Sequence, residues 1–188
     1  MPAGIADVAS RGMLQRPEVS PATKVLEERW PAAVVFTDIV ESTRRAAALG
    51  DTRWIGLQKA HDAILRRAVR RYAGQVVTDT GDGVVATFAS PVNAVRCALE
   101  IAAEARPLGV EIRAGVHFGE CRRRGKLLGG LVFHVGARVL ALARPGEVLV
   151  SSAVKAGTAD AGFEFVERGS HELKGLPGEW PVFAVVAR

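Results

Sequence analysis

Apolar and polar residues follow one another along this chain with periods that predict alternating strands and helices. A short, continuous apolar run at 32–39 is typical of a buried strand. Across 51–72 the apolar residues recur at helical spacing, and Gly74 is placed to end that helix. Two short β-prone runs, 75–78 and 84–88, flank a turn and therefore predict a hairpin.

The second half of the chain continues this alternation. Ser90 and Pro91 mark the start of a helix to about residue 105, because serine caps a helix and proline suits its first position. Further apolar runs predict a strand at 110–118, a helix at 132–143, a strand at 147–151 and a strand pair near 163–166 and 181–186. This order predicts an α+β fold, with a mainly antiparallel sheet and helices on one face.

Composition sets the scale of the protein. The 188 residues are 48% hydrophobic and 24% charged, which fits one globular domain of about 150 residues plus a tail. Residues 1–30 are interpreted as an N-terminal tail or linker and residues 31–188 as the domain. No run reaches the roughly 18 apolar residues of a membrane span, and no signal-peptide pattern is seen. Together with the widely separated Cys97 and Cys121, this predicts a cytoplasmic protein with reduced thiols and no membrane partner.

Two aspartates stand where an apolar run meets a turn. Asp38 is followed by Ser42 and Thr43, and Asp82 lies in the sequence Thr-Gly-Asp-Gly at 80–83. Carboxylates at strand ends suit Mg²⁺ or Mn²⁺, which keep some waters and share the rest of their shell with phosphates. Taken singly, each has a plainer explanation, a helix N-cap for Asp38 and a hairpin turn for Asp82. Their joint context favours a metal site.

Several stretches, all in the same order, resemble the class III nucleotidyl cyclase catalytic domain. The matching stretches are 36–43, 80–88, 112–119, 136–139, 145–151 and 171–175. The resemblance runs from about Trp30 to the end and is greatest to the compact soluble cyclases of mycobacteria and other actinobacteria. It implies a ferredoxin-like cyclase homology domain that works as a head-to-tail homodimer, with two composite sites that each use residues of both chains.

The resemblance also implies an activity and its metal ligands. Adenylate cyclases convert ATP to 3′,5′-cyclic AMP and pyrophosphate, by attack of the ribose 3′-hydroxyl on the α-phosphorus. Asp38 and Asp82, with the backbone carbonyl of Ile39, would hold two divalent ions, Mg²⁺ or Mn²⁺. One ion would lower the pKa of the attacking hydroxyl, and the other would neutralise charge on the triphosphate.

The remaining implied residues contact the phosphates and the transition state. Phosphate contacts fall on Val40, Glu41, Ser42, Thr43, Arg113 and Lys174, the first four because amides that open a helix can cradle an anion. Arg138 occupies the transition-state arginine position, and His134 stands where the family has an asparagine. Each also has a plain structural reading, with Arg138 as a surface residue, Lys174 as a turn residue, Arg113 as the partner of a carboxylate and His134 as a partly buried helix histidine.

The purine positions depart from the family pattern. Adenylate cyclases usually read adenine with a lysine and with an aspartate or threonine, and here those positions hold Thr78 and Leu127. A shift of the alignment by one residue would instead bring Lys126 to the purine. The glutamate and small residue of guanylate cyclases are absent too. Loss of a charge-assisted base contact forfeits about 1.5–3 kcal/mol of recognition, which weakens discrimination between ATP and GTP. The resemblance implies ATP as substrate, with GTP as the alternative.

Two other functions compete with a divergent adenylate cyclase. The altered purine pair is compatible with a non-catalytic or heterodimerising cyclase-like domain that binds nucleotide or modulates a partner cyclase. The net charge of +5 and the arginine runs at 66–71 and 122–124 are compatible with nucleic-acid binding. No aromatic stacking platform accompanies those arginines, so nucleic acid is not an expected partner.

Overall fold

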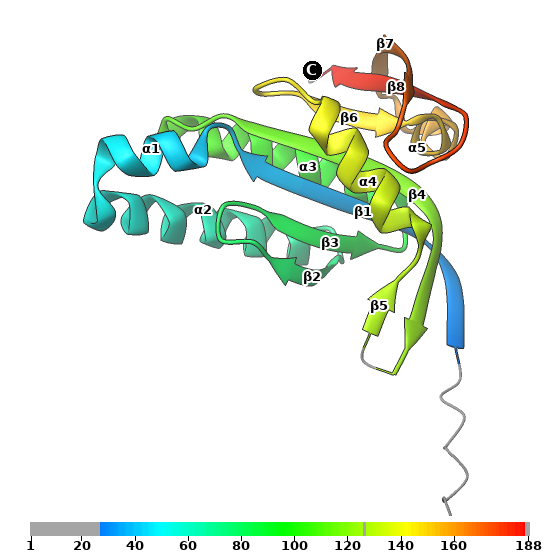
Figure 1. Ribbon diagram of the computed structural model, residues 1–188, viewed down its shortest axis with the longest axis horizontal. Coiled ribbons are helices and arrows are strands. Elements are labelled where there is room, and N and C mark those ends of the chain that lie inside the picture. The colour runs from blue at the N-terminus through cyan, green and yellow to red at the C-terminus, as the bar shows by residue number, and fades with distance from the viewer. Residues whose placement is uncertain (1–26, 126, 187–188) are drawn as a thin grey trace, which may run out of the picture.

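A mainly antiparallel sheet organises the chain, and the computed structural model describes residues 27–125 and 127–186 of it (Figure 1). The strands are β1 (Glu27–Ile39), β2 (Gln75–Asp79), β3 (Val84–Phe88), β4 (Ile112–Arg124), β5 (Leu127–Gly129), β6 (Val148–Ser151), β7 (Glu164–Glu172) and β8 (Glu179–Val186). The helices are α1 (Ser42–Leu49), α2 (Asp51–Arg71), α3 (Pro91–Ala105), α4 (Leu131–Leu142) and α5 (Ser152–Ala156), with 3₁₀ turns at Arg106–Leu108 and Ala159–Ala161.

The strand order is β2-β3-β1-β4-β6-β8-β7, with β5 paired to β4 off this path. Strands β4 and β6 run parallel, and the other described pairs are antiparallel. The α+β class and the mainly antiparallel sheet are therefore confirmed.

Helices cover both faces of this sheet, which corrects the expectation of helices on one face. Alternate residues of a strand point to opposite faces. Ala33 and Val35 of β1 belong to the core cluster that α2 and α3 complete. Val34, between them, lies in a second cluster with Val132 of α4. Helix α4 consequently packs on the face opposite α2 and α3, as Figure 1 shows.

Two strands extend further than the apolar pattern indicates. Strand β1 begins at Glu27 rather than at residue 32, and most of the proposed tail at 1–30 lies outside the described residues. Strand β4 continues through the basic run to Arg124 rather than ending at residue 118. Ion pairs between exposed side chains join the two extensions, Arg123 with Glu28 and Arg122 with Glu27. The basic run is thus partnered by acidic residues of a neighbouring strand.

Helix α4 lies unusually close to the sheet. A Cβ added to Gly115 of β4 would lie 2.2 Å from the backbone nitrogen of Leu140, and one on Gly136 would lie 2.8 Å from Val34 Cγ2. Glycines on both surfaces therefore permit backbone contact between α4 and the central strands. None of the helices in the described part of the chain has the length and apolarity that a bilayer crossing requires.

A buried histidine connects β4 to the neighbouring strands. The His117 ring is 8% exposed, its Nδ1 lies 2.8 Å from the hydroxyl oxygen of Ser151, and its edge meets the Trp180 ring at 6.0 Å between centroids. Burial lowers the pKa of His117 from 6.5 to about 4, because the charged form loses its hydration. The imidazole is accordingly neutral at physiological pH.

We expect Gly115→Ala to lower the free energy of unfolding by about 1–3 kcal/mol, because the new methyl group meets helix backbone that cannot rotate away. Gly56→Ala is the matched control, since Gly56 lies within α2 with nothing near the added atom, and it should raise stability by about 0.5–1 kcal/mol. Urea unfolding of the variants measures both effects. A Gly115→Ala protein as stable as the parent would contradict the close packing.

We also expect stability to fall as pH decreases from about 6.5 to about 4. In this window His117 takes up a proton in the unfolded chain but stays neutral in the folded protein, so protonation favours the unfolded state. The full contribution of His117 to the free energy of unfolding is therefore present above pH 6.5. The loss is on the order of 3 kcal/mol. Urea unfolding of the parent and of His117→Phe at several pH values isolates it, because the variant should show a shallower slope. Identical slopes would contradict the assignment.

Candidate active site

Asp38 lies at the end of β1, where the central strand leaves the sheet. It stands opposite Arg113 in the β1–β4 register. The Arg113 guanidinium donates to Asp38 Oδ2 from Nε at 3.0 Å and from Nη2 at 2.5 Å. The Asp38 side chain is 23% exposed, so this ion pair is partly buried at the end of the central strand. The carboxylate pairing that the sequence left open for Arg113 is thus present, with a predicted metal ligand as the partner.

The turn between β2 and β3 meets the end of β1. The Ile39 amide donates to the Asp82 carbonyl at 3.0 Å, and the Val84 amide donates to the Thr37 hydroxyl at 3.1 Å. A Cβ on Gly83 would lie 1.9 Å from the Thr37 carbonyl oxygen, so the two segments pass too closely for any other residue. These contacts bring the backbones of the two predicted metal ligands, at 38 and 82, together at one end of the central strands.

Two hydroxyl groups hold the Asp82 carboxylate. Ser42 Oγ donates to Asp82 Oδ2 at 2.7 Å, and Thr80 Oγ1 donates to Asp82 Oδ1 at 3.2 Å. Ser42 is the first residue of α1, so the start of that helix abuts the turn. A fixed carboxylate beside a helix start is suited to a bound cation and anion together.

The turn from β1 into α1 presents amides to solvent. Glu41 adopts a left-handed conformation with φ of 55°, which redirects the chain into α1. The first amides of a helix have no intrahelical partner, so those of Ser42 and Thr43 can receive an anion. The Val40 amide differs, because it donates to the Glu111 carbonyl at 2.9 Å. Val40 therefore offers no free amide to the predicted phosphate cradle.

A cavity of about 320 Å³ opens beside Asp82. Its lining residues are Ser42, Thr43, Ala46, Trp54, Gln58, Thr80, Gly81 and Asp82. Sequence reasoning assigned no role to Trp54, Gln58 or Thr80. Thr80 was detectable as the neighbour of Asp82 in the hairpin motif. Trp54 and Gln58 had no signal, because only tertiary packing brings α2 to this turn.

Other predicted residues lie on α4. His134 and Arg138 are both exposed and are spaced to share one face of the helix. Neither lines the cavity beside Asp82. Arg138 makes no ion pair or hydrogen bond to any residue that the structure describes.

The remaining predicted residues are dispersed as well. Lys174 lines a separate cavity of about 510 Å³ between β7 and β8. Thr78 is exposed on the edge strand β2, and Leu127 is 76% exposed on β5. One chain therefore gathers the predicted metal ligands and the α1 turn, while the predicted α4, β5 and Lys174 contacts lie on other surfaces.

The donor set fits a cation that also binds substrate. No cluster of three or more His, Cys, Asp or Glu side chains is arranged as a metal site within residues 27–125 and 127–186. Two carboxylates at 38 and 82 leave most of a coordination shell open. Mg²⁺ and Mn²⁺ tolerate this arrangement, because waters and phosphate oxygens complete their shells.

The chain resembles known proteins in sequence. No family model matches the chain. The chain is 36% identical over 156 residues to "Putative adenylate cyclase 3" of Rhizobium meliloti, a match that covers 77% of this chain and 26% of that protein. An uncharacterized Mycobacterium tuberculosis protein is 35% identical over 104 residues, which cover 53% of this chain and 36% of that protein. The chain thus spans about a quarter to a third of the length of these relatives.

Solved structures extend the likeness to most of the chain. The adenylyl cyclase CyaB from Pseudomonas aeruginosa superimposes with a TM-score of 0.80 at 19% identity, over 87% of this chain and 97% of that one. A structure named adenylate/guanylate cyclase/hydrolase from Silicibacter pomeroyi gives 0.77 at 26% identity, over 87% of this chain and all of that one. In sequence and in fold, this chain belongs to the class III nucleotidyl cyclase catalytic domains.

Proposed function

We propose that this chain is the catalytic domain of an adenylate cyclase, which converts ATP to 3′,5′-cyclic AMP and pyrophosphate in a head-to-tail homodimer. The meeting of the β1 end with the β2–β3 turn carries the proposal, because it brings Asp38 and Asp82 together beside the start of α1. Carboxylates next to free helix amides suit a metal-bound polyphosphate. The buried free thiols of Cys97 and Cys121 fit a cytoplasmic location.

The protein's own groups leave room for the two divalent ions. Asp38 Oδ1 receives no hydrogen bond from the residues that the structure describes, and Asp82 Oδ1 receives one long bond from Thr80. Asp38, Asp82 and the Ile39 carbonyl would hold Mg²⁺ or Mn²⁺. When bound, these ions supply the Lewis acidity that lowers the pKa of the ribose 3′-hydroxyl and the charge that balances the triphosphate.

The neighbouring side chains have separate tasks. Ser42 fixes the orientation of the Asp82 carboxylate, and the first amides of α1 bind phosphate oxygens. Arg113 engages Asp38 through Nε and Nη2, which leaves Nη1 to donate to a phosphate oxygen. Because the attacking hydroxyl and the α-phosphorus belong to one molecule, a correctly folded substrate supplies much of the rate gain.

A second copy of the chain would complete the site. His134 and Arg138 are exposed on α4, and exposed apolar side chains lie nearby in sequence, Leu127 at 76% and Leu131 at 56%. Exposed apolar residues beside an arginine that has no ion partner among the described residues are typical of a contact surface. In the proposed head-to-tail dimer, Arg138 and Lys174 of one chain face the metal ligands of the other. Arg138 then stabilises charge on the α-phosphoryl oxygens.

A second candidate is a cyclase-like domain that binds nucleotide, or pairs with another cyclase, without turnover of its own. One observation favours it, since Leu127 offers no polar atom to a purine. Mixing this chain with an active cyclase separates the candidates. A change in the partner's rate, from a chain that makes no product by itself, would favour the second.

Mixing two inactive variants tests the composite site. Asp82→Ala should abolish activity, and Arg138→Ala should lower it on the order of a hundredfold or more, because each removes one half of every site. In a one-to-one mixture half of the dimers are mixed and carry one intact site, so about a quarter of the parental activity should return. The measurement is cyclic AMP formed from ATP with Mn²⁺.

The control mixes Asp38→Ala with Asp82→Ala, which lie in the same half and should restore nothing. Activity in this control would contradict the assignment of halves. A dimeric parent protein with no product from ATP or GTP would contradict the enzyme.

The purine positions give a second test. Thr78→Lys combined with Leu127→Asp should raise the preference for ATP over GTP by roughly tenfold or more, because it restores charge-assisted base contacts. Turnover of both nucleotides, measured side by side with Mn²⁺, checks this. Thr52→Lys combined with Leu49→Asp introduces the same two side chains at exposed positions of α2 and α1 and should leave the ratio unchanged. An unaltered preference in the first variant would show that the base lies elsewhere.

A further inference from the structure

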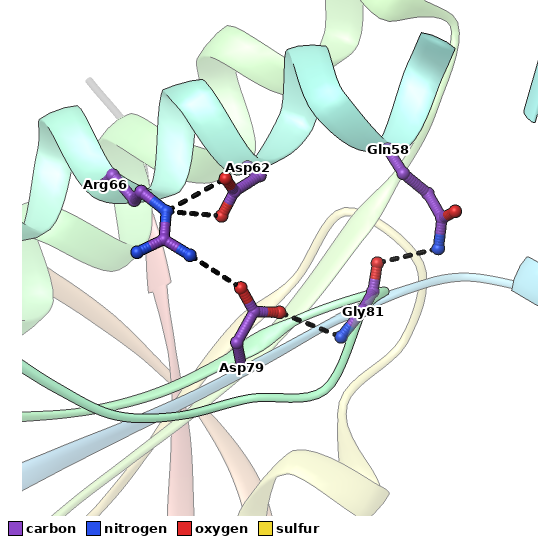
Figure 2. Close-up of polar contacts among 5 residues, drawn as sticks. All are labelled: Gln58, Asp62, Arg66, Asp79 and Gly81. Atoms are coloured by element: carbon purple, nitrogen blue, oxygen red, sulfur yellow. Dashed lines mark hydrogen bonds and ion pairs between the residues drawn. The ribbon is translucent and has the colours of Figure 1, made fainter. Parts of the chain in front are cut away.

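Side chains of α2 and β2 hold the turn that carries Asp82 (Figure 2). The Gly81 amide donates to Asp79 Oδ1 at 2.9 Å, and the Gly81 carbonyl accepts from Gln58 Nε2 at 2.8 Å. Both backbone polar groups of Gly81 are therefore engaged. The Gly81 carbonyl and the Asp82 amide belong to one planar peptide, so the Gln58 contact also fixes the backbone entering Asp82.

An arginine of α2 holds the Asp79 carboxylate in place. Arg66 Nη2 donates to Asp79 Oδ2 at 2.9 Å, and Arg66 Nε lies 2.9 Å from both carboxylate oxygens of Asp62. The Arg66 and Asp79 side chains are 49% and 42% exposed, so this ion pair contributes little stability by itself. The ion pair instead orients the Asp79 carboxylate. Arg66 engages Oδ2, and Oδ1 remains directed at the Gly81 amide.

The turn needs such contacts because of its glycine. Gly81 is exposed and has φ of +85°, a region in which glycine moves with little steric restraint. Asp82 follows directly, and its carboxylate must stay near Asp38 for the two to share ions. Gln58 also lines the cavity beside Asp82, so it contacts the turn from the side that a ligand would enter.

We propose that Gln58 and Asp79 are positioning residues for metal binding: by holding both backbone groups of Gly81, they fix the place of Asp82. This inference rests on the proposed function, in which Asp82 is a metal ligand. The proposed role requires neither residue to contact the substrate or the ions. Their effect reaches the site through the Gly81–Asp82 peptide.

The experiment measures metal binding directly, apart from turnover. Mn²⁺ binding to the full chain is followed by electron paramagnetic resonance, with α,β-methylene-ATP as a nucleotide that cannot be cyclised. Gln58→Met removes the donor while keeping the side-chain length. Asp79→Ala removes both Asp79 contacts, whereas Asp79→Asn keeps an oxygen for the Gly81 amide and weakens the Arg66 ion pair.

Gln58→Met and Asp79→Ala should each weaken Mn²⁺ affinity about three- to tenfold, the loss of one hydrogen bond of ordinary strength. Asp79→Asn should stay near the parent value, because the Gly81 contact survives. Glu104→Gln is the matched control, since it breaks the Arg67–Glu104 ion pair between α2 and α3, and it should leave affinity unchanged. Thermal unfolding without metal identifies any variant that is simply unstable.

Parental Mn²⁺ affinity in both Gln58→Met and Asp79→Ala would overturn the inference, as would an equal loss in Glu104→Gln. If the parent binds Mn²⁺ with the nucleotide but forms no cyclic product from ATP, the proposed catalysis fails while the binding comparison still decides the positioning role. Absence of Mn²⁺ binding in the parent would overturn both, because Asp82 would then hold no metal.

Discussion

The close passage of Thr37 past Gly83 is the contact on which the rest of the site depends. Any side chain at Gly83 would collide with the Thr37 carbonyl, so glycine alone lets the hairpin turn lie against the end of β1. The amide of Ile39 and the hydroxyl of Thr37 then bond to the turn. Two aspartates far apart in sequence become neighbours through backbone contacts rather than through their own side chains.

A similar backbone contact positions the surface of α4 that the proposed dimer uses. Gly115 and Gly136 let α4 approach β4 and β1 closely, which fixes the height and rotation of the helix on the sheet. Its exposed face consequently presents His134 and Arg138 in a defined direction. At the hairpin turn and at α4 alike, a glycine permits two backbones to pack closely. The polar side chains of the proposed site lie on the segments that this packing holds in place.

Local patterns were sufficient to predict most of the elements, and they failed where partners are distant in sequence. The hairpin strands, α2 and α3 follow from periodicity and from Ser90, which caps α3 by accepting from the Asn93 amide. The extra lengths of β1 and β4 did not, because each strand is extended by pairing with the other, which is distant in sequence. Periodicity also carries no information on which face a helix covers, which is why α4 was misplaced.

The contacts of the candidate site were predictable only in part. The motifs around Asp38 and Asp82 single out both carboxylates as candidate ligands, yet nothing in them indicates that Arg113 would pair with Asp38 or that Glu111 would occupy the Val40 amide. Both contacts arise from the β1–β4 register. The role of Gln58 could not be predicted for a related reason. Its partner is the Gly81 carbonyl, and every residue type has a backbone carbonyl, so the sequence does not indicate this contact.

Polar contacts are concentrated at one end of the proposed substrate site, and this bears on the choice between ATP and GTP. Hydrogen bonds and ion pairs surround the proposed metal and phosphate end, at Asp38, Ser42, Asp82 and Arg113, whereas the purine positions hold one hydroxyl and one leucine. Contacts to the reacting phosphates act in the transition state, and contacts to a distant base act mainly on binding. In the proposed cyclase, loss at the base end would therefore reduce discrimination between ATP and GTP before it reduces the chemical step. Choice of base and rate of cyclisation would then be separable properties.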